Sequence, residues 1–460
     1  MTVTQDAERI LEQIRHLLEQ GERERALGLL ASLLPADKAS LFETLDLQTQ
    51  ERLLPSVDAD DAADIMEEMD DDDAAALAEQ LDTALLTQVL NEMEPDEAAD
   101  LLGDLSPQLR FDALQGMESP EEVRPLLRYP DDSAGGLMTS DYYMYPEQMS
   151  VGRVFRDIRE QPPRDEEIPF VYAVDEEGRL TGAARLADLI RAHSEQPLSA
   201  ITQAEVLSVR AFDDQESVTR LINRYDLMAV PVLDDRARLV GVITADDAIA
   251  AQEEEVSEDF YGFAGIISAG GEEAARSDLL VRGPVWRAWK VRVPFLVITL
   301  LGSMLAGTVI GAYEHALESV IILAMFIPVV MTMGGNAGSQ STEIFIRGHA
   351  LGQIETGRFA RHLLREIIVG IGMGIIMGIV AGIIAAVWQG LPRLGLTVGI
   401  SMVGTMTVAA SMGFIVPFIL LKLGFDPAAG AIPFITTMID IIGLLVYFVL
   451  ATSLLGYMLP

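Results

Sequence analysis

The chain has 460 residues, and 70 acidic side chains against 32 basic ones give it a formal net charge of -38. An acid excess of this size argues against a nucleic-acid-binding protein, which needs a basic surface. The sequence contains no Cys, which excludes disulfides, thiolate chemistry and Cys-ligated zinc.

The charge is unevenly distributed along the chain. Residues 293–460 carry seven acidic and six basic side chains, whereas the preceding residues carry 63 and 26. The nearly neutral part also contains apolar runs long enough for a bilayer. We therefore predict an acidic, water-soluble front half and a membrane half. The N-terminal segment MTVTQDAERILEQIRHLLEQ lacks a basic stretch followed by a short apolar one, so we expect no cleavable signal peptide and a cytosolic front half.

Apolar positions recur every twelve residues between Ala36 and Met117. Each interval holds a helix of under three turns, and prolines or acidic clusters stand at the joints, where helix N-termini favour them. The pattern predicts an all-α superhelix over residues 1–130. Most of its acidic residues are interpreted as helix caps and solubilising groups.

A second repeat has an offset of 59 residues and relates residues 171–190 to residues 229–249. Each copy predicts a strand, an acidic turn, a strand and a helix. The pair resembles tandem α/β CBS domains, which we expect at residues 131–200 and 201–250. The resemblance implies that a Gly-x-x-Thr-x-x-Asp element binds an adenine nucleotide such as ATP, and the second copy keeps it as Gly241, Thr244 and Asp247. Alternatively, Thr244 is an ordinary helix cap.

Five apolar segments in residues 291–460 are long enough to cross a membrane. Basic residues gather on the connections that a cytosolic N-terminus places inside, which predicts an external C-terminus and a multi-pass protein of the cell (inner) membrane. The segments are residues 293–313, 319–342, 363–388, 396–422 and 431–458. In the third, Gly370, Gly374, Gly378 and Gly382 form a small-xxx-small pattern that predicts close helix packing.

Asp440 is the acidic residue deep in the last apolar segment. A carboxylate at that depth costs about 2.5–3.5 kcal/mol on insertion scales, so it is expected to face a wet cavity or a partner. No Lys or Arg lies at comparable depth, which leaves a bound cation or a proton. Thr436, Thr437 and Gly443 share its helical face.

The second apolar segment ends in the sequence GGNAGSQST, residues 334–342. We expect Gly334 and Gly335 to interrupt its helix, which is tolerated at membrane depth only against protein or water. Asn336 and the hydroxyl and amide residues after it supply uncharged oxygen atoms. These are ligands that suit Mg²⁺, which keeps most of its water.

Over nearly its whole length the chain resembles the MgtE family of magnesium channels. The resemblance rests on the order of superhelix, CBS pair, connecting helix (residues 251–290) and five spans, and on GGNAGSQS and the Asp440 helix. It implies a homodimer with a pore on the twofold axis and with Asp440 of both subunits binding hydrated Mg²⁺. Asn336 and Gly443 match pore positions of the family, and we predict that Gly335 and Thr437, which lie beside these residues, bind the pore ion with them.

The family resemblance also implies a sensor, in which cytosolic Mg²⁺ binds between the superhelix, the CBS pair and a connecting plug helix and closes the pore. Clustered carboxylates repel one another until a divalent ion screens them, so such a sensor is physically reasonable. In the superhelix, Asp96 and Asp100 are candidates because their i, i+4 spacing places them on one face. The other matching acids are Asp214, Glu216, Asp226, Asp246, Asp247, Glu255, Glu258 and Asp259.

Other functions remain open from the sequence. Some relatives carry an amide side chain where this chain has Ile432, so the ion can be Co²⁺, Mn²⁺ or Ni²⁺ instead. Asp440 can also serve a proton-coupled carrier, and a membrane-anchored nucleotide or Mg²⁺ sensor is a third alternative. No nucleophile and base, P-loop or zinc-ligand spacing is present, so an enzyme is not expected.

Overall fold

The computed structural model describes residues 10, 12–18, 20, 22–160, 169–263, 285–314, 321–354, 356–425, 427 and 431–455. The chain forms two compact units. Among these residues, the first unit extends to Glu255 and the second begins at Val256.

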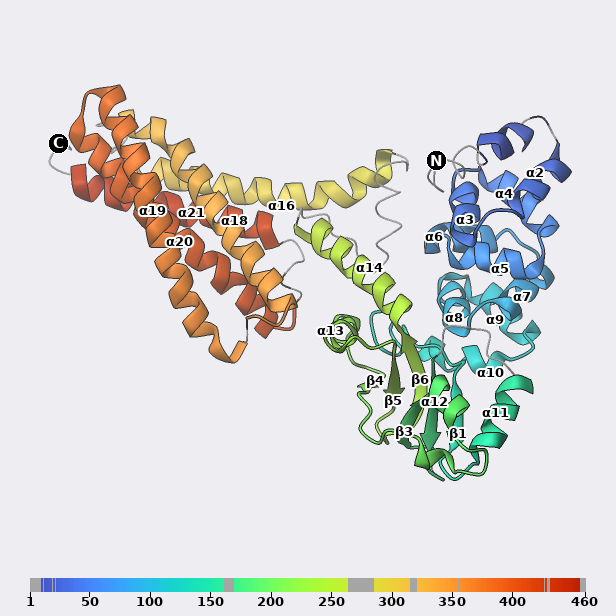
Figure 1. The fold of residues 1–460 in the computed structure, drawn as a ribbon. Coiled ribbons are helices and arrows are strands. Elements are labelled where there is room, and N and C mark those ends of the chain that lie inside the picture. Colours follow the sequence, from blue (N-terminus) through green and yellow to red (C-terminus); the bar gives the residue numbers. More distant parts are fainter. Residues whose placement is uncertain are drawn as a thin grey trace. The chain divides into compact units, whose positions relative to one another are not determined.

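The first part of the first unit is a stack of short helices, as predicted (Figure 1). Alternate helices pack together, so that α3, α5, α7 and α9 form one layer and α4, α6 and α8 form the other. Ile65, Leu77 and Val89, which are fully buried, belong to the twelve-residue pattern. The helices are α2 (Arg23–Leu30), α3 (Pro35–Glu43), α4 (Leu47–Leu53), η1 (Leu54–Ser56), α5 (Ala59–Glu67), α6 (Asp71–Ala78), α7 (Thr83–Glu92), α8 (Pro95–Asp104), α9 (Pro107–Gly116), α10 (Pro120–Val123) and η2 (Leu126–Arg128).

Acidic residues at the joints include caps of the expected kind. The carboxylate of Asp46 accepts from the backbone N–H of Thr49, and that of Asp82 accepts from Leu85. Such bonds satisfy amide groups that have no partner within the helix.

A second set of bonds, which the sequence analysis did not anticipate, links residues 27 apart. The backbone N–H of Glu94, before α8, donates to Glu67 Oε1 at the end of α5 at 2.7 Å. The same arrangement joins α6 to the start of α9, where the N–H of Ser106 donates to Glu79 Oε1 at 2.6 Å. Each bond therefore ties the end of one helix to the start of the third helix after it, and so joins the two layers.

The CBS pair consists of two copies of one α/β motif, which confirms the predicted strand, turn, strand and helix. In each copy the first strand is parallel to the second, and the second is antiparallel to the third. The first copy contains β1 (Tyr143–Pro146), α11 (Val151–Glu160), β2 (Phe170–Val174), β3 (Leu180–Arg185) and α12 (Leu186–Arg191), followed by η3 (Leu198–Ala200). The second contains β4 (Val209–Arg210), α13 (Gln215–Tyr225), β5 (Ala229–Leu233), β6 (Leu239–Thr244) and α14 (Ala245–Phe263).

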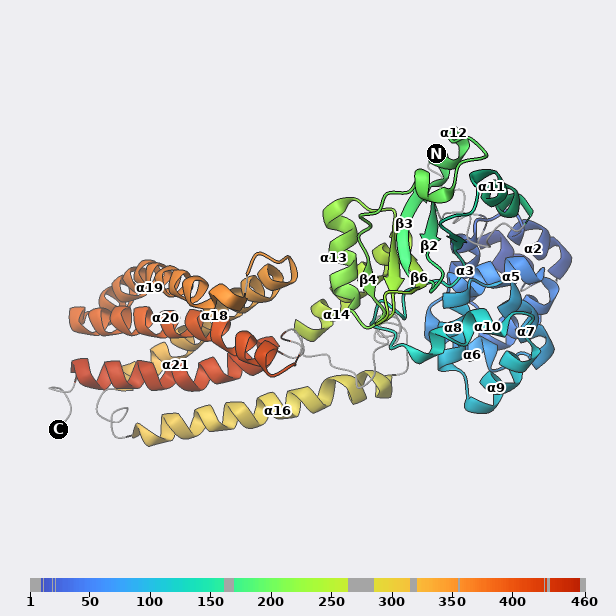
Figure 2. The ribbon, with the colours of Figure 1, turned by 90° about the horizontal axis from the view of Figure 1, so that it is seen from below.

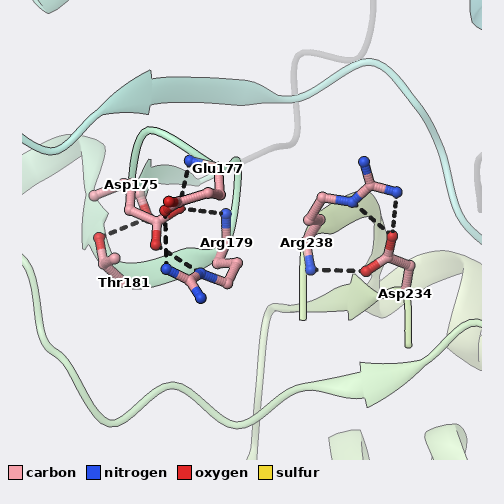
Figure 3. Close-up of polar contacts among 7 residues, drawn as sticks. Asp175, Glu177, Arg179, Thr181, Asp234 and Arg238 are labelled. Carbon is pink, nitrogen blue, oxygen red and sulfur yellow. Dashed lines mark hydrogen bonds and ion pairs between the residues drawn. The ribbon is translucent and has the colours of Figure 1, made fainter. Parts of the chain in front are cut away.

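The acidic turns of the two copies face each other. Their backbones exchange bonds, from Leu180 N–H to Ala237 O at 3.3 Å and from Leu239 N–H to Gly178 O at 3.2 Å. Figure 3 shows that each turn is closed by an Asp–Arg pair, Asp175 with Arg179 at 2.7 Å and Asp234 with Arg238 at 2.6 Å. These acids therefore stabilise the turns.

Among its described residues, the second unit has five helices long and apolar enough to cross a membrane, as predicted; the ribbon of this unit is drawn in Figure 2. Helix α20 lies at the centre and packs against α18, α19 and α21, while α16 packs against α21. The elements are α16 (Val285–Ala312), η4 (Ile321–Phe326), α18 (Ile327–Ala350), η5 (Thr356–Arg358), α19 (Phe359–Gln389), α20 (Pro392–Lys422) and α21 (Ala431–Leu455).

The expected interruption at Gly334 and Gly335 is wrong, because α18 is helical from Ile327 to Ala350. A Cβ on Gly334 would lie 3.0 Å from Thr405 Cγ2 of α20 and 3.5 Å from Ile439 of α21. Gly338, one turn later, also contacts Ile439. These two glycines thus serve close helix packing rather than a helix break.

The glycines of α19 pack as predicted. Gly378 and Gly382 lie against the backbones of Gly399 and Gly395 of α20, where an added Cβ would come within 2.6 Å of a carbonyl oxygen. The small residues therefore let the two helices approach backbone to backbone.

The bond between α5 and α8 provides a stability test. Glu67→Ala removes the acceptor for the Glu94 amide, and we expect a local loss of about 1 kcal/mol, or about fivefold faster amide exchange in the first turn of α8. Hydrogen exchange of the full chain measures this. Glu68→Ala, at an exposed neighbour, is the control; equal exchange in the two variants would contradict a role for Glu67.

Candidate cation pathway and sensor site

A stripe of exposed polar side chains runs along α18. Its members are spaced four, four, three and four residues apart, so they share one helical face. Polar groups are costly against lipid, so this face is suited to water or to another protein surface. The stripe consists of Thr332, Asn336, Gln340, Glu343 and Arg347.

Asp440 is half-buried on α21. In the described part of the chain, no hydrogen bond or ion pair reaches its carboxyl group. Ile439, directly before it, is 2% exposed and is held by Gly334 and Gly338 of α18. The α18 helix with the polar stripe therefore packs against α21 at the residue next to Asp440.

The other predicted pore residues have different surroundings. Asn336 is exposed, and an added Cβ on Gly335 would meet nothing within 4 Å, so neither is covered by the described residues of the chain. Gly443 is buried against α20, where Thr405 Oγ1 donates to its carbonyl oxygen at 3.4 Å. Thr437 contacts Gly302 of α16. Gly443 and Thr437 thus take part in helix packing.

In the first unit, Asp96 of α8 is brought close to Asp247 of α14. Asp96 is 6% exposed, and its Oδ1 atom is buried without a hydrogen-bond partner among the described residues. Burial, followed by the charges of Asp247 and Glu94, raises its pKa well above the usual range, although hydrogen bonds from its own backbone N–H and from Thr139 oppose the shift. A buried acid with an unsatisfied oxygen beside a second acid is suited to a bound cation.

Two further acids of α8 lie near this pair. Burial, followed by the charge of Asp96, raises the pKa of Glu97. The side chain of Asp100 is exposed at the surface, however, and Glu97 is only half-buried. Asp96 is therefore the acid with the strongest structural reason to bind a cation.

The remaining sensor candidates are dispersed. Asp214 caps α13 by accepting from the N–H of Glu216 at 2.9 Å, and Asp226 ends that helix with φ of 51°. Glu255 accepts from Gln215 Nε2 at 2.8 Å. Among the described residues no three His, Asp or Glu are arranged to hold a metal. Of the others, Glu216 lies 3.2 Å from Arg220, Asp246 is exposed, and the Glu258 and Asp259 side chains lie outside the described atoms.

The predicted nucleotide element has internal partners. Thr244 precedes α14, its Oγ1 donates to Asp247 Oδ2 at 2.5 Å, and its backbone N–H donates to the same oxygen at 3.3 Å. Gly241 packs against Met138. In this structure Thr244 and Asp247 thus act as a helix cap, the alternative left open by the sequence.

Some residues of the site were missed in the sequence analysis. Thr332 and Glu343 extend the polar stripe, and their spacing from Asn336 in a continuous helix is the signal that would have revealed them. The expected helix break hid this pattern. Glu366, buried on α19, was counted only as a charge.

The raised pKa of Asp96 predicts how stability depends on pH. Since burial favours its neutral form, its contribution is fully present below the ordinary value of about 4 and is lost as pH rises through the raised value. With a chelator present, we expect the thermal midpoint of the full chain to fall over this range. Asp96→Asn should flatten the fall, whereas Glu92→Gln, at an exposed acid of α7, should not. Circular dichroism measures the midpoint, and identical profiles for all three proteins would contradict the assignment.

Comparisons with known proteins cover most of the chain. Family models match "MgtE intracellular N domain" at residues 9–85 and 33–132, "CBS domain" at 198–254 and "Divalent cation transporter" (MgtE) at 327–450. "Magnesium transporter MgtE" of Thermus thermophilus is 37% identical over 334 residues, which are 73% of this chain and 72% of that protein. The Bacillus subtilis protein of the same name is 34% identical over 74% of each chain.

Solved structures include the "cytosolic domain of the Mg2+ channel MgtE in complex with ATP". It is 31% identical with a TM-score of 0.49, and the match covers 52% of this chain and 99% of the solved one. On the strength of its family models and of relatives that match over nearly three quarters of their length, the chain belongs to the MgtE family and is a multi-pass membrane protein.

Proposed function

We propose that this protein carries Mg²⁺ across the cell membrane into the cytosol. The carrying observation is that α18, in a bundle of apolar helices, carries an exposed polar stripe on one face and packs by the glycines of its other face against α21, at the residue that precedes Asp440. The relatives named magnesium transporters support Mg²⁺ as the ion.

The chemistry of the stripe suits a hydrated divalent cation. Asn336 and Gln340 offer carbonyl oxygens, Thr332 offers a hydroxyl, and Asp440 supplies charge. Mg²⁺ gives up its water reluctantly and is usually bound through one or two carboxylates with several waters retained. Asp440 would therefore attract the hydrated ion, while neutral oxygen atoms hydrogen-bond to its water shell. This division of roles permits rapid release, which conduction requires.

We infer that two subunits form the pathway. In one subunit Asn336 is exposed and Asp440 is only half-buried, so neither is enclosed by its own chain. Helix α14 also carries an exposed apolar stripe, in which Ile249, Val256 and Phe260 are 63%, 48% and 71% exposed. An apolar stripe outside the membrane spans is suited to pairing with a second copy. The proposed pore lies on the twofold axis.

Gating by cytosolic Mg²⁺ is proposed to depend on Asp96 and Asp247. The two acids come from the superhelix and from the second CBS copy, so a cation between them would hold these parts together. Without the cation, their repulsion favours separation. Because α14 is one helix from Asp247 to Phe263, a change at Asp247 acts on the helix that also carries Glu255, Glu258 and Asp259. The ion shifts the equilibrium only by its difference in affinity for the two states.

In the proposed orientation the N-terminus is cytosolic and the C-terminus lies outside the cell. Most basic residues of the membrane unit lie at the helix ends that a cytosolic N-terminus places inside, whereas Arg393 lies at the outer side. The residues at the inner ends are Arg347, Arg358, Arg361, Arg365 and Lys422. The proposed location is the cell membrane.

An adenine nucleotide at the second CBS copy is a second, independent proposal. Its support is the Gly241, Thr244 and Asp247 element, and binding would have to open the Thr244–Asp247 cap. ATP added to the transport assay below tests it by comparing the wild type with Thr244→Ala.

The transport role of Asp440 is testable in sealed proteoliposomes. We expect Asp440→Ala to reduce Mg²⁺ influx by about tenfold or more, because the pathway loses its charged ligand. Glu314→Ala, at an exposed residue just after the end of α16, should retain influx. Normal influx through Asp440→Ala would contradict the proposal, and influx abolished by collapse of a proton gradient would favour a proton-coupled carrier.

The dimer can be tested by cross-linking, because the protein contains no Cys. Phe260→Cys, on the exposed stripe of α14, should form a disulfide-linked dimer under mild oxidation in the full chain. Phe111→Cys on α9, which is also exposed, is the control. Equal cross-linking of both variants would indicate random collision and contradict this interface.

A further inference from the structure

A carboxyl group without an assigned role is buried in the second unit. Glu366 of α19 is 7% exposed, and its Oε1 atom accepts a hydrogen bond from Ser341 Oγ of α18 at 2.6 Å. Among the described residues no Lys, Arg or His forms an ion pair with it. Burial of an acid without a cationic partner is costly, so the contact with Ser341 is its principal compensation.

Ser341 lies at the meeting point of three helices. It is 1% exposed, and Gly413 of α20 lies so close that an added Cβ would be 2.8 Å from Ser341 Cβ. Its hydroxyl oxygen is also 3.0 Å from the carbonyl oxygen of Ala337. One hydroxyl proton is therefore shared between an acceptor on its own helix and the carboxyl group of α19.

The turn of α18 that ends at Ser341 also holds the Asp440 segment. Gly338 lies one turn before Thr342, whose hydroxyl donates to the Gly338 carbonyl at 2.9 Å. Gly338 contacts Ile439, the residue before Asp440. A helix interface made of glycines has few side chains to fix its axial position. The Glu366–Ser341 bond is a directional contact that can fix it.

We propose that Glu366 is a positioning residue of the cation pathway: through Ser341 it fixes the rotation and height of α18, and so the placement of Asn336 and of the Ile439–Asp440 turn. This inference rests on the proposed role of Asp440 in binding the ion. Glu366 itself touches Ser341 rather than the ion. Its effect is on the placement of Asn336 and Asp440, and so on how well these ligands fit Mg²⁺.

The test compares Glu366→Ala, Ser341→Ala and the double variant in full-length protein in proteoliposomes. Each single variant is expected to raise the half-saturating Mg²⁺ concentration on the order of tenfold and to change the preference for Mg²⁺ over Co²⁺. The half-saturating Mg²⁺ concentration of the double variant should be no higher than that of either single variant, because both substitutions remove the same bond. Glu366→Gln keeps an Oε1 acceptor for Ser341 and should stay within about twofold of the wild type.

The controls separate positioning from stability. Ser411→Ala removes a hydroxyl of α20 that bonds to its own helix, at the Thr407 carbonyl, and should leave half-saturation unchanged. After Glu366→Ala, Ser341 can still donate to Ala337, so we expect a folded protein, with Ser341→Ala as the milder substitution. A lower maximal flux with unchanged half-saturation and ion preference would overturn the proposal.

Asp440→Ala, measured in parallel, distinguishes the two proposals. If it retains normal flux, the proposed ion site is wrong. If it loses flux while Glu366→Ala and Ser341→Ala keep wild-type half-saturation and selectivity, the ion site stands and the positioning role of Glu366 is wrong.

Discussion

The close contact between α18 and its neighbours is the constraint on which the membrane unit depends. Lipid gives apolar helices little reason to associate, so their contact relies on surface fit and on hydrogen bonds. Gly334 and Gly338 let α18 approach Ile439, and the same approach leaves the opposite, polar face of α18 exposed. One set of glycines thereby decides which residues pack and which can meet a cation.

Three uses of carboxyl groups in the first unit differ in what satisfies the oxygen atoms. At Asp46 they cap helices, at Asp175 they close turns, and at Asp96 one is buried beside another acid. The first two uses satisfy the carboxyl group with N–H donors. The third leaves an oxygen unsatisfied, and this difference marks Asp96 as a candidate for cation binding more clearly than acidity alone.

Much of the fold could be predicted from the sequence because it rests on periodicity. The twelve-residue pattern, the 59-residue repeat and the apolar runs each correspond to elements in the structure. The break at Gly334 was predicted wrongly, because a glycine's local freedom cannot be told from its use in helix packing without the neighbour. For the same reason the contact of Glu366 with Ser341, 25 residues away, is absent from any local pattern. The pore and sensor residues stay predictions.

The bonds between residues 27 apart give the superhelix a property that helix stacking alone lacks. In many repeat proteins each repeat touches only its neighbours, so an array can fray from either end in small steps. Here the end of α5 is tied to the start of α8, and the end of α6 to the start of α9, so these spans overlap along the chain. Loosening α5, α6, α8 or α9 therefore breaks a bond to a helix of the other layer as well as the contacts within its own layer. The superhelix should consequently resist bending between any two neighbouring helices. A force applied at α8 would then displace the superhelix along its length rather than bend it at one position.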